Sequence, residues 1–90
     1  MADISVKKIG DNEFSVTVVE GVSTTIHTVT SMESDGERYG VNVSREHLIK
    51  LSFEFLLERE SKESILRNFD LPIIEHYFPE YPREIRKRIA

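Results

Sequence analysis

The first third of the chain alternates apolar and polar residues with a period of two, the pattern of a half-buried β-strand. Residues 4–6 and 14–18 follow it, and 22–30 form a third run rich in β-branched residues. The turn-forming residues of 10–12 and the Glu-Gly pair at 20–21 separate these runs. We therefore predict a three-stranded antiparallel meander.

The third run has few large apolar residues. Only Val22, Ile26 and Val29 stand among its threonines and serines. This predicts either that one face of the strand remains in water or that the strand lies at a sheet edge. An open edge can pair with another chain, which is a route to dimerisation.

Residues 31–43 allow two interpretations. Ser31 can cap a short helix that runs to Tyr39 and stops at Gly40. Alternatively, Asp35-Gly36 forms a turn and residues 39–43 form a short fourth strand. We favour a loop followed by the fourth strand.

From Ser44 the pattern becomes helical. Ser44 is a suitable N-cap and Glu46 complements the helix dipole in the first turn. The polar positions form one narrow stripe: His47, Lys50, Glu54 and Glu58. A helix with so wide an apolar face needs cover on more than one side. It should lie between the sheet and the later helices, or between two subunits.

Shorter helices follow. Ser61 can cap one that carries Ile65, Leu66 and Phe69, and Asp70 can cap the next. Pro79 ends that helix, and Pro82 begins the last one.

The predicted fold class is α+β: an N-terminal three- to four-stranded antiparallel meander packed on a central helix at about 44–60, with two or three short C-terminal helices. Residues 1–90 form a single domain, in which 1–43 are mainly strands and 44–90 are helices. The length of 90 residues fits one domain, and 39% apolar with 31% charged residues indicates a globular chain.

Composition excludes several classes of site. The chain has no cysteine, so disulfides, thiolate zinc sites and a cysteine nucleophile are absent. No apolar run approaches the roughly 18 residues that a membrane helix needs. The N-terminus shows no basic-then-apolar leader. We expect a small soluble cytoplasmic domain without a metal or other cofactor.

The net charge of −4 is unevenly spread, because an acidic body ends in a basic tail. The tail cations are candidate phosphate contacts: Arg83, Arg86, Lys87 and Arg88. They predict, as an alternative function, weak and salt-sensitive nucleic-acid binding. The simpler interpretation, which we favour, is that cations stabilise the C-terminal turn of the last helix.

No recognisable catalytic arrangement emerges. The three histidines have no histidine partner at helical metal spacing, and we interpret His27 as a surface residue. Glu54 and Glu58 share a helix face, but Lys50 one turn earlier makes this a common charge ladder. The glycines of 36–40 lack the rest of a phosphate loop. We lean against an enzyme, and keep a small enzyme with an unrecognised pocket as an alternative.

The segment 77–82 concentrates three aromatic residues and two prolines in six positions. Such residues suit a partner surface, because a tyrosine ring can be buried while its hydroxyl stays hydrated. The candidate surface residues are Tyr77, Phe78, Pro79, Tyr81 and Pro82. Alternatively, the aromatic side chains complete the core and the prolines set helix boundaries. The leading hypothesis is a non-catalytic protein-interaction or regulatory module whose partner is another protein or a second copy.

The C-terminal half also resembles a family of small uncharacterised prokaryotic proteins. The resemblance lies in four stretches: SFEFLLERE (52–60), ESIL (63–66), FDL (69–71) and YFPEY (77–81). It implies no substrate, cofactor or catalytic residue. It does imply that YFPEY is a family feature.

Overall fold

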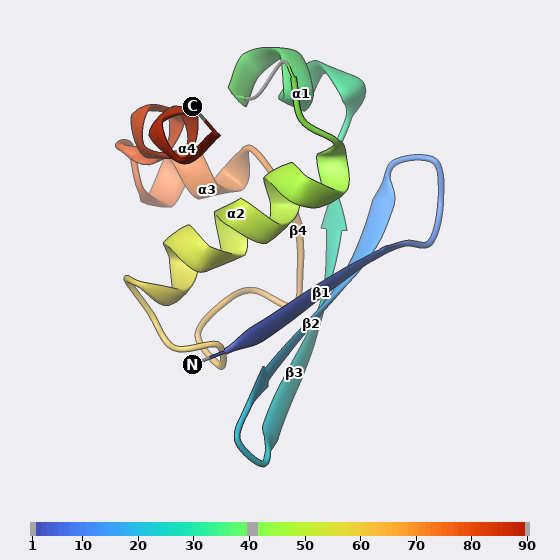
Figure 1. Ribbon diagram of the computed structural model, residues 1–90, viewed down its shortest axis with the longest axis vertical. Helices are drawn as coiled ribbons and strands as arrows, with labels where there is room; N and C mark the ends of the chain where they lie inside the picture. The colour runs from blue at the N-terminus through green and yellow to red at the C-terminus, as the bar shows by residue number, and fades with distance from the viewer. Residues whose placement is uncertain (1, 40–41, 90) are drawn as a thin grey trace.

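The computed structural model describes residues 2–39 and 42–89 and combines a four-stranded sheet with four helices (Figure 1). The sheet order is β1-β2-β3-β4. In chain order the elements are β1 (Asp3–Lys8), β2 (Glu13–Glu20), β3 (Ser23–Thr30), α1 (Glu33–Tyr39), α2 (Arg45–Leu57), β4 (Asn68–Asp70), α3 (Ile73–Tyr77) and α4 (Tyr81–Ile89). The α+β fold class is confirmed.

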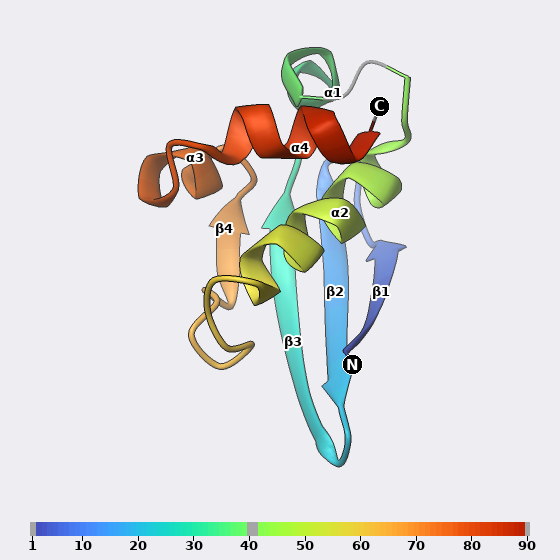
Figure 2. The ribbon, with the colours of Figure 1, turned by 60° about the vertical axis from the view of Figure 1, so that its left-hand side comes forward.

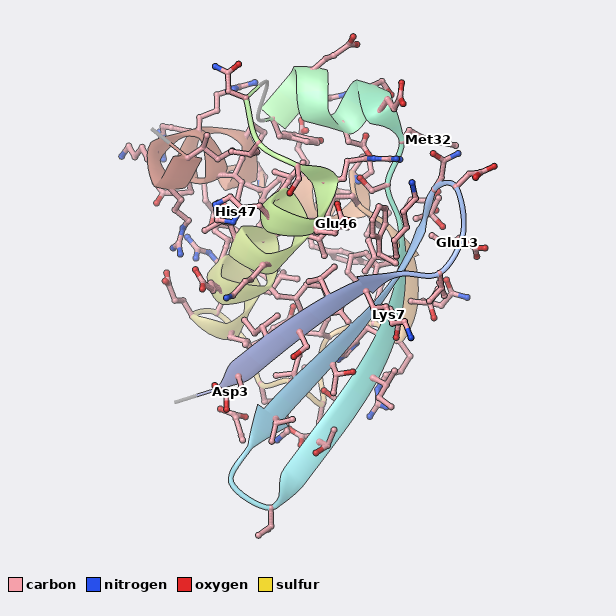
Figure 3. The ribbon with its side chains drawn as sticks, turned by 45° about the vertical axis from the view of Figure 1, so that its right-hand side comes forward. Asp3, Lys7, Glu13, Met32, Glu46 and His47 are labelled. Atoms are coloured by element: carbon pink, nitrogen blue, oxygen red, sulfur yellow. The ribbon has the colours of Figure 1, made fainter. Side chains whose placement is uncertain are left out.

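The predicted meander is present. β1 pairs antiparallel with β2, and β2 pairs antiparallel with β3 along its whole length. Gly21 takes the positive φ of 59° in the turn between β2 and β3, where a side chain would be strained. Figure 2 shows this hairpin extending beyond the helices, and Figure 3 shows Asp3 and Lys7 towards opposite ends of β1.

β3 has one buried face and one exposed face. Thr25, His27 and Val29 are buried, whereas Thr24 and Ile26, which alternate with them, are exposed. One face therefore remains in water, as the first of the two interpretations predicted. The strand is not an edge along its full length, because β4 pairs with its last three residues.

Residues 33–39 form α1, so the favoured loop interpretation of this stretch was wrong and the alternative of a short helix that runs to Tyr39 is confirmed. Its predicted cap at Ser31 was wrong, because the Ser31 hydroxyl makes no hydrogen bond to the described residues. The carboxylate of Asp35 accepts a hydrogen bond from the Met32 backbone N–H at 3.0 Å. Asp35 thus satisfies a free donor at the helix start, which favours a helix over a turn. Of the predicted strand 39–43, Gly40 and Val41 lie outside the described residues; Tyr39 is helical, and Asn42 and Val43 are not in a strand.

The fourth strand comes instead from Asn68–Asp70 and is parallel to β3. The Thr28 N–H donates to the Arg67 carbonyl at 2.8 Å, and the Leu71 N–H donates to the Thr30 carbonyl at 2.9 Å. The predicted helix that begins at Ser61 and carries Ile65, Leu66 and Phe69 was therefore wrong. Alternation decides the outcome, because Phe69 and Leu71 are buried whereas the residues beside Phe69 are exposed.

α2 is the central helix. It begins at Ser44, whose hydroxyl accepts a hydrogen bond from the His47 N–H at 3.1 Å, and His47 itself lies near the exposed start of the helix (Figure 3). On the sheet side, the Phe53 ring contacts the ring of His27 at a centroid distance of 5.2 Å. On the other side, the Phe55 ring contacts that of Tyr81 in α4 at 5.3 Å. The prediction of cover from both the sheet and the later helices is confirmed.

The last two helices lie close to their predicted positions. α3 begins after Pro72 without a side-chain cap, so the predicted cap at Asp70 was wrong. α4 carries Pro82 in its first turn. The backbone N–H that proline lacks would have no partner within the helix at this position. The hydrophobic core joins both layers: Phe14, Val16, Val18, Val29, Tyr39, Leu48, Ile49, Phe53, Phe55, Leu56, Ile65, Phe69, Leu71, Ile74, Tyr81 and Ile85.

Among the described residues, no helix has the length and apolar character required to span a membrane.

Candidate functional site

A hollow of about 250 Å³ lies between the end of α2, the following loop, β4 and α3. Its ten lining residues are Leu56, Glu60, Ser64, Ile65, Leu66, Phe69, Ile73, Ile74, Tyr77 and Phe78. Eight of the ten have apolar or aromatic side chains, and we call this hollow the apolar pocket. Two rim residues are well exposed, Leu66 at 46% and Tyr77 at 60%.

One wall of the apolar pocket is the segment 58–67, which contains no helix or strand. His27 anchors it from the sheet. Since the Leu66 carbonyl can only accept, the Nδ1–H of His27 must donate to it, at 2.8 Å. In the neutral ring Nε2 then accepts from the Thr25 hydroxyl at 2.9 Å. The wall is thus bonded to the sheet beneath it.

The prediction that His27 is a surface residue was wrong. Its side chain lies on the same face of β3 as Thr25 and Val29, the face that the helices cover, and it is fully buried. Burial lowers the pKa of His27 below its ordinary value, and the positive charge of Arg67 lowers it further, against the hydrogen bond to Leu66. The ring is a neutral, fully bonded member of the core.

Lys62 anchors the same segment to the turn between β2 and β3. Its Nζ lies 3.2 Å from Oε1 of Glu20 and 2.8 Å from Oε2 of Glu63. Only 6% of its side chain is exposed. The adjacent Glu63 carboxylate holds the pKa of Lys62 above its ordinary value. His27 and Lys62 therefore both hold this wall, which has no regular secondary structure.

Glu60 is the one charged residue among those that line the apolar pocket. Burial raises the pKa of its carboxyl above the ordinary value. Within the described parts of the chain, its side chain makes no ion pair and no hydrogen bond. The carboxylate is half-buried beside apolar residues and has no counter-charge from the described residues to offset its partial desolvation.

The structure divides the predicted aromatic-proline surface. Tyr77 and Phe78 line the apolar pocket, with Tyr77 exposed and Phe78 half-buried. Pro79 is exposed on the connection to α4, and Pro82 is half-buried in the first turn of α4. Tyr81 has no exposed surface.

Tyr81 is therefore a core residue, and its place on the predicted surface was wrong. Ser52 donates its hydroxyl hydrogen to the Leu48 carbonyl at 2.7 Å. The Tyr81 hydroxyl must then donate to the Ser52 oxygen, at 2.6 Å. The Tyr39 and Phe55 rings contact its ring edge-on, at centroid distances of 5.0 and 5.3 Å. Pro79 follows the end of α3 and Pro82 lies in the first turn of α4, so the two prolines mark the helix boundaries on either side of this ring.

Two cations of the basic tail are bound within the molecule. Arg88 pairs with Glu58, with Nη2 and Oε1 2.6 Å apart. This hydrogen bond holds the pKa of Glu58 below its ordinary value. The Arg86 guanidinium donates to the Arg38 carbonyl at 2.9 Å. These groups pack α4 against α2 and α1.

The other two tail cations are exposed beside an acid. The side chains of Arg83 and Lys87 both lie near Glu84, at 3.9 and 3.6 Å. The four candidate phosphate contacts therefore do not form one open basic surface.

The remaining candidates stay apart. His47 and His76 are exposed on different helices. Glu58 is committed to Arg88 and does not act with Glu54. Over residues 2–39 and 42–89, no cluster of three or more His, Asp or Glu side chains is placed to hold a metal ion.

Sequence reasoning missed Glu60, Leu66 and Ile73 as lining residues. Glu60 falls at the end of the predicted central helix as one of several acids, and Leu66 falls in a predicted helix that does not form. The available signal was the run of small and charged residues at 58–64, which predicts an irregular connection.

Comparison of the chain with models of known families, with curated proteins and with solved structures found no match. The resemblance in the C-terminal half therefore stays a prediction, and any function must be argued from the apolar pocket.

Proposed function

We propose that the chain is a non-catalytic interaction module that binds another protein by accepting one of its side chains in the apolar pocket. The observation that carries the proposal is an apolar hollow whose rim residues, Leu66 and Tyr77, are about half exposed. Large apolar side chains exposed next to a hollow are typical of binding surfaces.

The size of the apolar pocket favours a side chain over a small-molecule ligand. Ligand sites usually measure about 300–1,000 Å³, whereas this hollow measures about 250 Å³. Protein interfaces often concentrate their affinity in one anchor side chain that enters a fitted pocket. The measured volume suits such an anchor.

The composition of the rim supports the same proposal. Tyr77 combines a large ring with a hydroxyl that remains hydrated, a pairing enriched at interfaces. It is the last residue of α3, and its ring lies edge-on to the ring of His76 at a centroid distance of 5.4 Å. An aromatic side chain has few rotatable bonds, so it loses little conformational entropy when a partner binds.

A small neutral probe tests whether the apolar pocket accepts an alkyl chain. In a titration with 1-hexanol followed by amide chemical shifts, we expect the largest shifts at the lining residues. Leu66→Ala and Tyr77→Ala each remove apolar contact area and should weaken binding about three- to tenfold. Met32→Ala is the control, because Met32 is equally exposed, at 49%, and lies away from the pocket.

Equal weakening by all three variants, or no shifts at the lining residues, would contradict the proposal. A peptide-display selection on the wild-type protein, with counter-selection on Tyr77→Ala, then identifies the partner segment. We expect a monomer in sedimentation at micromolar concentration. A dimer that Tyr77→Ala dissociates would instead make a second copy the occupant.

A further inference from the structure

The apolar pocket contains one charged residue that a purely apolar anchor would leave without a counter-charge. Glu60 lines the hollow and, across the residues that the structure describes, has no cation beside it. Burial of this unpaired carboxylate raises its pKa, with no opposing contribution from a nearby positive charge. A partner that brings a cation would supply the counter-charge that Glu60 lacks.

The cations nearest to Glu60 in sequence are already committed elsewhere. The Arg59 guanidinium stacks on the Phe55 ring, 3.6 Å from its centroid, and its Nε lies 3.0 Å from Oε2 of Glu80. Lys62 is buried between Glu20 and Glu63. Because both cations hold structural positions, neither is free to turn towards Glu60.

The remaining lining fits the stem of a long cationic side chain. Leu66 and Ile73 offer aliphatic surface, and Tyr77 offers an aromatic ring at the rim. A lysine side chain can bury its four methylene groups against such surface while its ammonium stays near polar groups. An aromatic face and a carboxylate both favour an alkylammonium ion.

We propose that the partner's anchor is a lysine, whose aliphatic stem fills the apolar pocket and whose ammonium pairs with Glu60. This inference rests on the proposed function, because it names the side chain that the pocket accepts. It assigns Glu60 as the residue that selects a cationic anchor over a neutral one of similar length.

Matched probes test the assignment. At pH 7, n-hexylammonium and 1-hexanol carry the same alkyl chain and differ in the charge of the head group. From amide shifts at the lining residues, we expect hexylammonium to bind about fivefold more tightly than hexanol. Glu60→Gln should remove this preference, because it deletes the charge that distinguishes the two probes. Glu37→Gln, which deletes an exposed acid on α1, should keep the preference.

The outcomes separate the two proposals. If neither probe shifts the lining residues, the proposed function fails and the inference fails with it. If both probes bind equally, or if Glu60→Gln keeps the preference, the lysine assignment is overturned while the apolar pocket stands. A preference that Glu37→Gln also removes would show a general effect of protein charge and would likewise overturn it. Amide spectra of both variants verify that each is folded.

Discussion

Replacing Tyr81 with alanine is expected to lower the free energy of unfolding by about 3–5 kcal/mol, the usual cost of truncating a large buried aromatic side chain. Tyr81 has no exposed surface and contacts the rings of Tyr39 and Phe55. A domain of this size has a stability of only about 5–13 kcal/mol. Urea denaturation followed by circular dichroism measures the change.

Two variants isolate the cause of this loss. Tyr81→Phe keeps the ring and removes only the hydrogen bond to Ser52, so about 1 kcal/mol should be lost. Tyr77→Ala truncates a side chain that is 60% exposed and should cost less than about 1 kcal/mol. Similar losses for Tyr77→Ala and Tyr81→Ala would contradict the division of the aromatic-proline segment into core and pocket rim.

The second large effect is expected at His27. His27→Leu fills similar space but leaves the Leu66 carbonyl and the Thr25 hydroxyl without their partner. Unsatisfied buried polar groups should lower the free energy of unfolding by about 2–4 kcal/mol. Because the bond to Leu66 holds one wall of the apolar pocket, hexanol binding should weaken as well. A variant as stable as the wild type would show that these two hydrogen bonds make no net contribution to the free energy of unfolding.

The same residue produces a defined pH dependence. The pKa of His27 is lowered in the folded state, mainly by burial, so between that value and the ordinary 6.5 the unfolded chain binds more protons. Stability is therefore complete above pH 6.5 and is lost as the pH falls through this window. Urea denaturation at several pH values from about 7 to 5 gives the free energy of unfolding as a function of pH. This free energy should fall less with decreasing pH for His27→Leu than for the wild type. Equal slopes would exclude His27 as the source.

The sequence predicted those elements whose apolar pattern is compatible with only one secondary structure. Alternation at 14–18 and the turn at Gly21 specify the meander, and the wide apolar face after Ser44 requires a doubly covered helix. The stretch 61–71 was misassigned because Ile65 and Phe69 are four positions apart, which suits a helix as well as two separate buried anchors. Pairing with β3, a partner distant in sequence, decides for a strand.

The pocket was less accessible to sequence reasoning than the fold. Tyr77 and Phe78 were selected from composition alone, and that composition could not separate them from the buried Tyr81. Glu60 could not be selected at all. Its distinction is the lack of a neighbouring cation, which depends on the positions that Arg59 and Lys62 take in the fold.

The parallel pairing of β4 with β3 has a consequence for the order in which the molecule folds. The hairpins of β1, β2 and β3 close over short loops, whereas His27 and Leu66 are 39 positions apart. Distant contacts form slowly because a long loop must first be closed, and here α1 and α2 lie within that loop. β4 should therefore join the sheet late. Phe69, which lines the apolar pocket and lies in β4, takes its position in the same step. A partner that occupies the pocket would bind only chains that have completed this last step, and would hold them there by mass action.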